Sequence, residues 1–246
     1  MVQQRLQKVL AAAGVNSRRK CEELILEGAV RVNRKVVDTL PVFVDPEKDV
    51  IVVNGRKIRA VRKVYFLLNK PKGVICTNSD PQGRVRAIDL VPVRERIFCI
   101  GRLEVDTAGL IILTNDTELA NKLTHPRYGL AKTYVAEVKG QINERAAEKL
   151  KRGVWPAGGK GSRASIKILR RGIKDSLLEI TVWQGANLQI RRILARVGLD
   201  VRSLQRTRIG KIDAKGLGVG KFRALTDDEV GYLKRATADN LIKKQR

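Results

Sequence analysis

Residues 101–116 read GRLEVDTAGLIILTND, and this stretch contains the clearest strand signal of the chain. The four aliphatic residues at 110–113, followed by Thr-Asn-Asp, are typical of a buried strand that ends in a turn. Two carboxylates, Glu104 and Asp106, precede the strand, and we expect Gly109, or the small Ala108 beside it, to let the backbone bend between the two parts. In a chain with 50 lysines and arginines, this arrangement indicates a site that acts on a polyanion.

The composition is that of a folded protein. With 246 residues, 43% of them hydrophobic and 30% charged, the chain can form one large domain or two unequal ones. No apolar run approaches the roughly 18 residues of a membrane-spanning helix, and the first residues lack the apolar core of a secretory signal. We therefore expect a cytoplasmic protein. Three scattered cysteines and one histidine, His125, predict neither a disulfide framework nor a structural metal site.

The net charge of +25 is the strongest compositional feature and favours a polyphosphate partner. Basic residues recur from end to end, whereas membrane-surface binding usually concentrates them on one amphipathic helix. Nucleic acid is therefore the favoured partner. The aromatic content of 4% argues against a single-strand binder built on stacked bases.

The first part of the chain has the pattern of two helices followed by a small sheet. We expect a helix over residues 5–13, a second over 18–27 with Ser17 as its N-cap, and strands within 29–37 and 50–58. This pattern resembles the S4 RNA-binding domain. The resemblance implies that a basic helix face binds structured RNA, and the alternative is a merely solvated face. The cations of that face are Arg5, Lys8, Arg18, Arg19 and Lys20.

The remainder of the chain is predicted to be an α+β domain. Strand signals recur at 64–68, 135–138, 166–169, 177–182 and 206–210, and helix signals at 143–151 and 190–196. Because no regular strand–helix–strand alternation is present, we expect a mostly antiparallel, mixed sheet. The predicted division is an S4-like module at 1–60, a larger domain at 61–235 and a frayed basic tail at 236–246.

Three motifs resemble one enzyme family. They are the GRLEVDTAG segment at 101–109, the Asn-Lys-Pro-x-Gly loop at 69–73 and Gln-Ile-Arg-Arg at 189–192. Together with the S4-like module they resemble the small-subunit-type branch of bacterial ribosomal RNA pseudouridine synthases over nearly the whole chain. The resemblance implies isomerisation of uridine in ribosomal RNA or a pre-ribosomal particle, by a monomer, without cofactor or metal. It does not fix the target uridine.

The resemblance places Glu104 where this family carries its catalytic aspartate. The extra methylene moves the carboxylate by about one bond length, and an error of about 1 Å in a reacting group can cost roughly 100-fold in rate. Glu104 is therefore either an active or a lapsed catalytic residue. Asp106 is a second catalytic candidate, because residues two apart in an extended segment face the same side. The alternative for Asp106 is a structural role in the turn.

The resemblance assigns the other site residues. Arg191 matches the family arginine that pairs with the catalytic carboxylate and lowers its pKa. Tyr134 matches the tyrosine that stacks on the flipped base, although a lone aromatic residue is more often part of a core. Arg102 is expected to help open the RNA stack, and Gln189 and Arg192 are expected to contact RNA. The family reads Gly-Arg-Asn-Arg before this glutamine, whereas this chain reads Gly-Ala-Asn-Leu.

Two functions from different classes therefore remain. The first is a cofactor-independent RNA-modifying enzyme. The second is an RNA-binding or ribosome-assembly protein that keeps the synthase fold without turnover. Glu104 is the residue that discriminates between them.

Overall fold

The computed structural model describes residues 3–59, 61–152, 164–183 and 190–242. The chain forms two compact units. Unit 1 comprises Met1–Val64, Val93–Arg96 and Asn115–Thr117, and unit 2 comprises the rest of the chain. None of the described helices is both long and apolar enough to cross a lipid bilayer.

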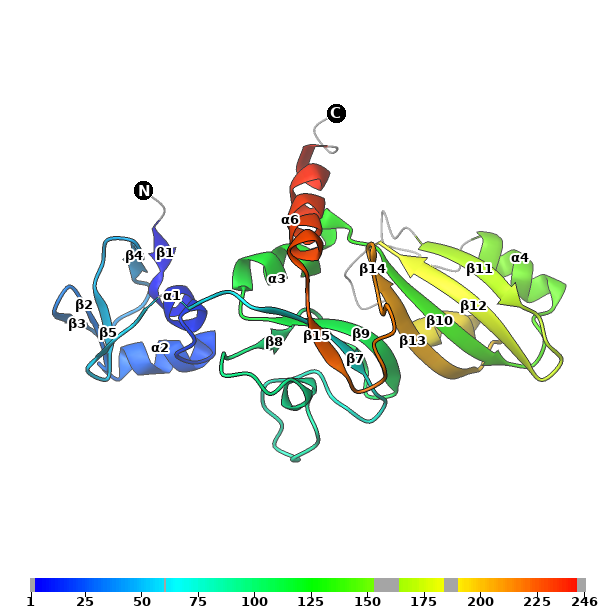
Figure 1. The fold of residues 1–246 in the computed structure, drawn as a ribbon, viewed down its shortest axis with the longest axis horizontal. Coiled ribbons are helices and arrows are strands. Elements are labelled where there is room, and N and C mark those ends of the chain that lie inside the picture. Colours follow the sequence, from blue (N-terminus) through cyan, green and yellow to red (C-terminus); the bar gives the residue numbers. More distant parts are fainter. Residues whose placement is uncertain (1–2, 60, 153–163, 184–189, 243–246) are drawn as a thin grey trace. The chain divides into compact units, whose positions relative to one another are not determined.

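Unit 1 contains the helix pair and small sheet that the sequence predicts (Figure 1). Ser17 caps the second helix through a 3.2 Å bond from the Lys20 amide to its hydroxyl, and Asn54 and Gly55 both have positive φ, as a type I′ turn requires. The buried core is made by residues such as Leu6, Leu10 and Ile25. The elements are α1 (Leu6–Ala12), α2 (Arg18–Leu26), a sheet of β3 (Lys35–Val37), β2 (Val30–Val32), β5 (Ile51–Val53) and β6 (Arg56–Lys57), and the pair β1 (Gln4–Arg5) and β4 (Phe43–Val44).

Unit 2 is built on a nine-stranded sheet with the main order β11-β12-β10-β13-β9-β7-β15 (Figure 1). Among the described strands of this sheet, β9 and β13 pair in parallel and every other pairing is antiparallel, which confirms the predicted mixed sheet. The strands are β7 (Tyr65–Lys70), β8 (Phe98–Cys99), β9 (Thr107–Thr114), β10 (Lys132–Lys139), β11 (Ala164–Arg170), β12 (Asp175–Val182), β13 (Val201–Ile209), β14 (Ile212–Asp213) and β15 (Phe222–Ala224).

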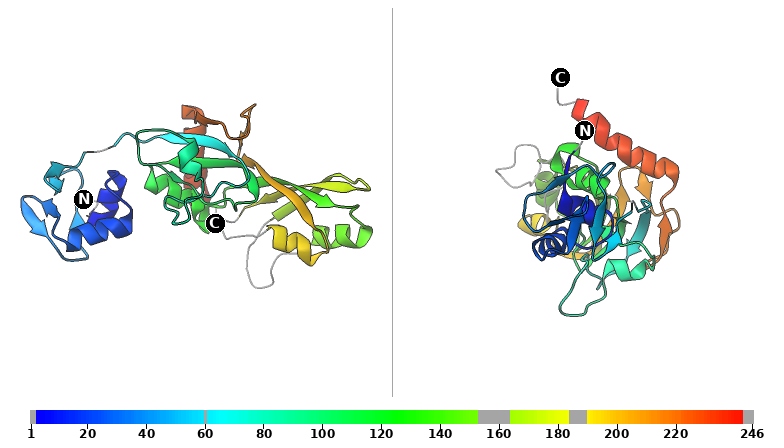
Figure 2. Two further views of the ribbon diagram at one scale, coloured as in Figure 1. Left: turned by 90° about the horizontal axis from the view of Figure 1, so that it is seen from below. Right: turned by 90° about the vertical axis from the view of Figure 1, so that its left-hand side faces the viewer.

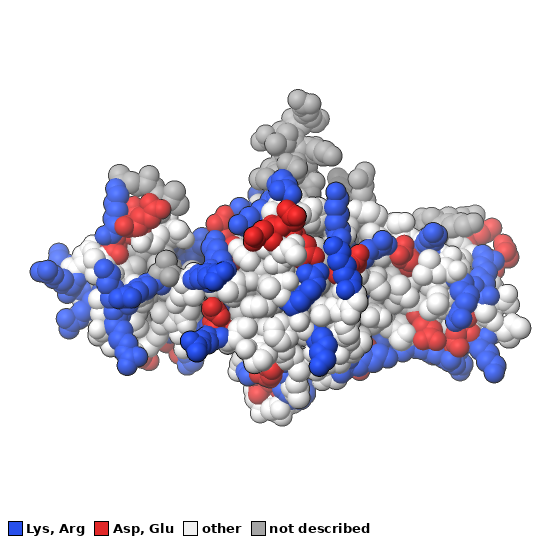
Figure 3. Space-filling view, in the orientation of Figure 1, with Lys and Arg blue, Asp and Glu red and all other residues white. Residues whose placement is uncertain are grey.

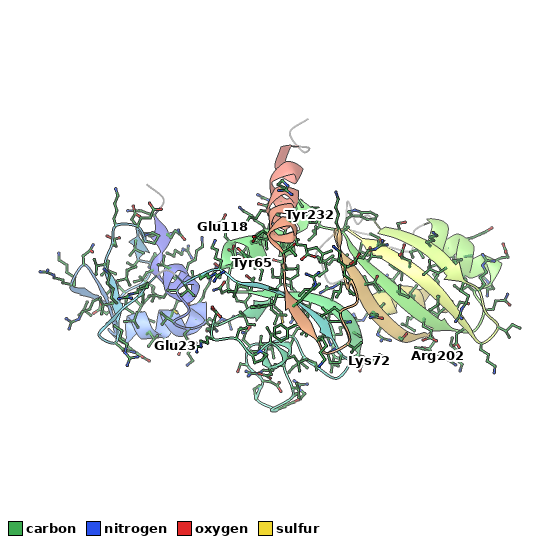
Figure 4. All side chains as sticks on the ribbon, in the orientation of Figure 1. Glu23, Tyr65, Lys72, Glu118, Arg202 and Tyr232 are labelled. Carbon is green, nitrogen blue, oxygen red and sulfur yellow. The ribbon has the colours of Figure 1, made fainter. Side chains whose placement is uncertain are left out.

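Helices pack on this sheet through two apolar clusters (Figures 1 and 2). One cluster joins α4 (Glu144–Arg152) and α5 (Ile190–Arg196) to β10, β12 and β13. The other joins α3 (Thr117–Thr124) and α6 (Asp227–Ile242) to β7 and β9, and Tyr65 and Tyr232 pack against it (Figure 4). Two short 3₁₀ helices, η1 (Ala87–Leu90) and η2 (Pro126–Tyr128), complete the described part of the unit.

The C-terminal segment differs from the prediction. Residues 236–242 are not a frayed tail but the last part of α6. Val230 and Leu233 lie in the apolar cluster, Ala236 packs against it, and Thr237 is 3% exposed, with its hydroxyl 2.8 Å from the Lys234 carbonyl oxygen. These residues follow the three- and four-residue spacing of one helix face, and positions 236–242 contain no lysine or arginine, because the basic residues of the predicted tail begin at 243, outside the described residues.

The sequence predicts that Gly109 bends the chain ahead of β9. In the structure this residue lies inside the strand, with a φ of +108°. It faces Arg206 of β13 in the parallel pairing. A side chain at position 109 would overlap the main-chain nitrogen and oxygen of Arg206. The glycine is therefore required by the close approach of two strands as well as by its backbone conformation.

Gly109→Ala is expected to lower the free energy of unfolding by more than about 2 kcal/mol, because backbone overlap is added to the strain of a positive φ. Gly140→Ala is the matched control, since Gly140 has a φ of +77° but open space around it. The control should cost about 1 kcal/mol. Urea unfolding of both variants checks this, and equal losses would contradict the overlap argument.

Candidate active site

The order of the central strands brings the ends of three strands together. The starts of β9 and β13 lie at the same edge of the sheet because these strands are parallel, with Thr107 opposite Leu204. The end of β7 joins them because β7 is antiparallel to β9, with Lys70 opposite Gly109. Figure 4 shows Lys72, which follows β7, and Arg202 of β13 at this edge. The segment at 101–106, which enters β9, therefore lies where strand ends from three parts of the sequence meet.

Glu104 and Asp106 lie in a tight turn at this edge. The Thr107 amide donates a 3.0 Å hydrogen bond to the Glu104 carbonyl oxygen, which closes a four-residue turn. Of the two readings that the sequence left open for Asp106, this bond agrees with a place in a turn and not with an extended segment. Both residues are exposed, so their carboxylates are open to a partner.

Two hydrogen bonds attach this turn to the segment that follows β7. The Gly73 amide donates to the Val105 carbonyl oxygen at 2.8 Å. The Leu103 amide donates to the Cys76 sulfur at 3.4 Å, and the Leu103 side chain is 6% exposed. The residues on both sides of Glu104 are thus anchored, while its own side chain projects from a fixed backbone.

Arg191 of α5 reaches the same turn. Its guanidinium donates to the Val201 carbonyl oxygen at 2.8 Å and to the Asp106 carbonyl oxygen at 3.3 Å. Its Nε is buried and has no hydrogen-bond partner among the described residues. Within that same part of the chain, no ion pair joins Arg191 to Glu104. The sequence therefore predicted the location of Arg191 but not its contacts, which are with main-chain oxygens.

Arg206 is a site residue that the sequence reading missed. It is 2% exposed and its Nε donates to the Leu110 carbonyl oxygen at 2.5 Å. Its Nη1 lies 3.4 Å from the Tyr134 hydroxyl oxygen, and its guanidinium carbon lies 5.9 Å from the centre of that ring. Tyr134 also packs against the apolar cluster beneath α4 and α5, so it serves both the core and the site.

Arg206 could have been predicted as a site residue from the alternation of buried and exposed positions along β13. Leu204, Arg206 and Ile209 are its buried residues, so Arg206 occupies an inward position two residues from an apolar one. A cation at such a position is rare without a structural or functional partner.

Lys70 and Lys132 add positive charge to this region. Lys70 is fully buried and its ammonium donates to the Pro71 and Val74 carbonyl oxygens at 2.9 and 2.8 Å. Burial lowers the pKa of Lys70, whereas the negative charge of Asp106 is among the groups that raise it. Burial, followed by the charge of Arg206, lowers the pKa of Lys132 to about 8. A buried and a half-buried lysine that both sense the charge of Arg206 favour an anionic ligand.

The predicted RNA contacts fall in both units. In unit 2, Arg102 and Arg192 are exposed, and Gln189 lies outside the described residues, as does the divergent loop before it. In unit 1, Lys20 forms a 2.5 Å ion pair with Glu23. The other predicted cations of unit 1 comprise one half-buried lysine and three exposed arginines, namely Lys8, Arg5, Arg18 and Arg19. Figure 3 shows that lysines and arginines are spread over the visible face rather than gathered in one patch.

An S4 domain followed by an RNA pseudouridylate synthase domain defines the class of this chain. The S4 model matches residues 4–51 and the RNA pseudouridylate synthase model matches residues 64–196. The chain belongs to the RNA pseudouridylate synthase family, as its motifs predict.

The relatives match this chain over nearly its full length. The chain is 47% identical over 240 residues to ribosomal large subunit pseudouridine synthase B of Bacillus subtilis, covering 96% of this chain and 98% of that protein. It is 40% identical to an RNA pseudouridine synthase of Aquifex aeolicus over the full length of both. The crystal structure of a pseudouridylate synthase superimposes with a TM-score of 0.65 and 27% identity, covering 93% of this chain and 99% of that one.

Lys132 provides a pH test of the buried positive charge. Its pKa of about 8 in the folded protein lies below the usual value near 10.4, so between these pH values the unfolded chain binds a proton that the folded protein does not. Stability relative to Lys132→Met should therefore rise as the pH increases from 8 to 10, by up to about 1.4 kcal/mol per pH unit.

Urea unfolding of the two proteins at several pH values measures this difference. Lys139→Met is the control, because Lys139 is an exposed lysine at the other end of the same strand. A difference between wild type and Lys132→Met that stays constant from pH 8 to 10 would contradict a buried lysine.

Proposed function

We propose that this protein isomerises uridine to pseudouridine in ribosomal RNA without a cofactor, with Glu104 as the reacting carboxylate. The observation that carries the proposal is the anchored turn at the edge of the sheet, where Arg191 contacts the turn that presents Glu104. Homologues named as ribosomal RNA pseudouridine synthases support the reaction, and the Bacillus subtilis relative favours large-subunit RNA as substrate.

The reaction needs only groups that the site contains. The bond from the ribose to the uracil nitrogen breaks, the uracil turns and a bond from the ribose to its carbon 5 forms. The proton on that carbon is then removed, and the freed nitrogen takes up a proton, so that the product is an isomer of the substrate. A carboxylate at the ribose or acting as base can serve these steps, and Arg191 would fix the turn that presents Glu104 through its bond to the Asp106 carbonyl oxygen. The Tyr134 ring would stack on the flipped base, with Arg206 fixing its hydroxyl end.

The RNA would be held by both parts of the chain. We assign residues 1–60 to an RNA-docking module whose cations contact phosphates without reading the base sequence. The residues from position 61 onward are assigned to the catalytic domain. Arg102 and Arg192, both exposed beside the turn and Arg191, would contact RNA next to the extruded nucleotide. Gln189 is assigned to RNA as well. We also assign the protein to the cytoplasm and expect it to act as a monomer.

One observation favours a second candidate function. Glutamate stands at position 104 in place of the family's aspartate, and among the described residues it makes no ion pair with Arg191. A protein that binds ribosomal RNA in the same way but no longer turns over would show these features. Replacement of Glu104 separates the two functions.

Glu104→Gln is expected to reduce turnover by roughly 1,000-fold, because it keeps the size of the side chain and removes the reacting charge. Release of tritium from ribosomal RNA that carries 5-tritiated uridine measures the reaction. Asp106→Asn is the matched control, since Asp106 lies in the same turn, and it should keep most of the activity.

Glu104→Asp completes the experiment. If wild type and Glu104→Asp both release tritium, Glu104 is an active catalytic residue. If only Glu104→Asp does, the natural protein is an RNA-binding protein with a lapsed site. An inactive Asp106→Asn beside an active Glu104→Gln would transfer the catalytic role to Asp106.

The affinity for ribosomal RNA should fall steeply with salt, because many phosphates are neutralised at once. Replacing Arg18 and Arg19 of α2 with alanine together should lower the slope of log affinity against log salt by about 2. Lys48→Ala, in the exposed loop between β4 and β5, should leave the slope unchanged. Filter binding over a salt series measures the slopes, and equal slopes for all three proteins would contradict RNA docking by α2.

A further inference from the structure

One asparagine, Asn69, fastens the segment that enters β15 to the end of β7. Its amide donates to the Lys221 carbonyl oxygen at 3.0 Å, and its carbonyl oxygen accepts from the Gly220 amide at 2.7 Å. Its Nδ2 donates to the Leu217 carbonyl oxygen at 2.8 Å. The Lys221 amide in turn donates to the Gly218 carbonyl oxygen at 3.1 Å, which closes a four-residue turn. We call the four residues from Gly218 to Lys221 the β15 turn.

The side chain of Asn69 is explained by this attachment and not by core packing. Asn69 is 5% exposed, and its Oδ1 is buried without a hydrogen-bond partner among the described residues. Because a buried oxygen in that state destabilises a fold, an apolar side chain would serve the core better. The amide nitrogen, however, satisfies the carbonyl oxygen of Leu217, which directly precedes the β15 turn. The contribution of the Asn69 side chain is therefore to hold this turn in place.

The β15 turn lies at the same edge of the sheet as the turn that presents Glu104. β15 is antiparallel to β7, with Phe222 opposite Leu68, so the start of β15 lies beside the end of β7. Lys72 follows β7 at this edge (Figure 4), and the next residue, Gly73, donates to a carbonyl oxygen of the Glu104 turn at 2.8 Å. The Glu104 turn, Lys72 and the β15 turn therefore follow one another along the edge.

The two sides of the Glu104 turn differ in charge along this edge. On the side of β15, the segments 70–73 and 218–222 contain three lysines and no carboxylate. Two of these lysines, Lys72 and Lys221, are exposed, and neither forms an ion pair within the described part of the chain. On the side of β10 and β12, the edge segments carry Asp175 and Asp200 among their cations, and Asp175 is paired with Arg202. Phosphates are therefore favoured on the side of β15, where no carboxylate of these segments repels them.

We propose that Lys72 and the β15 turn bind the phosphates of the RNA strand that flanks the extruded nucleotide, with Asn69 as the positioning residue of this turn. The strand leaves the Glu104 turn toward β15 and not toward β12. Lys72 and Lys221 contact phosphate oxygens, and Val219, which is 61% exposed, faces the sugars between them. The direction of the strand rests on the proposed function, because that function places the extruded nucleotide at the Glu104 turn. Contact between RNA and the β15 turn does not require turnover.

Photocrosslinking of the full chain to ribosomal RNA tests the path of the strand. A benzophenone amino acid replaces three exposed aliphatic residues one at a time, namely Val105 in the Glu104 turn, Val219 in the β15 turn and Ile173 between β11 and β12. Crosslinks from positions 105 and 219 should map to the same RNA segment, and position 173 should give none there. A crosslink to that segment from position 173, or none from position 219, overturns the proposal. Crosslinks from none of the three positions overturn the proposed function as well.

The lysine contacts are tested by the salt dependence of binding. Lys72→Ala combined with Lys221→Ala should lower the slope of log affinity against log salt by about 2, because two phosphate contacts are lost. Lys149→Ala combined with Lys174→Ala is the matched control, since both of these lysines are exposed and lie in α4 and just before β12. The control should keep the slope of the natural protein. Equal slopes for the two double variants contradict the phosphate contacts.

Asn69→Leu separates positioning of the turn from folding. This change keeps a side chain of similar shape, removes the bond to the Leu217 carbonyl oxygen and leaves the main-chain bonds of position 69 in place. The crosslink from position 219 should fall severalfold while that from position 105 keeps its yield. Hydrogen exchange at the Lys221 amide should become about tenfold faster. Equal losses at both positions, or no loss at either, overturn the positioning role of Asn69.

Discussion

The close parallel pairing of β9 with β13 is the constraint on which the rest of unit 2 depends. It is possible only because Gly109 has no side chain where the Arg206 backbone passes. The pairing unites the two halves of the sheet, since β7 and β15 follow on one side of it and β10, β12 and β11 follow on the other. It also sets the start of β9 beside the start of β13, and so brings the Glu104 turn within reach of Arg191.

Buried positive charge gives the site its chemical character. Lys70 and Arg206 are held in place by main-chain carbonyl oxygens, which satisfy their donors without cancelling their charge. An anion that enters such a region is stabilised more strongly than it would be in water, because the local dielectric is low.

Local sequence signals predicted the helices, strands and turns. The contacts of the candidate site depend on packing between segments that lie far apart in the sequence. The N-cap at Ser17, the turn at Asn54-Gly55 and the aliphatic run within β9 depend on neighbours in the sequence and were predicted correctly. The role of Gly109 depends on a strand almost a hundred residues away, and no local pattern contains it. The sequence left the segment at Glu104 and Asp106 open between an extended stretch and a turn, because the bond that closes the turn comes from the backbone at Thr107 and not from side-chain alternation.

The pairing of β9 with β13 also has a consequence for the order in which the protein is made. The bond from Arg206 to the Leu110 carbonyl oxygen spans 96 residues, whereas the two helices and the small sheet of unit 1 come from the first sixty or so. Contacts of low sequence separation form early and those of high separation form late. During translation, the helices and small sheet of unit 1 are therefore complete while the sheet of unit 2 still waits for β13 to leave the ribosome. A nascent chain that has not reached residue 206 has these elements of unit 1 but lacks the strand that joins the two halves of the larger sheet and sets the Glu104 turn beside Arg191.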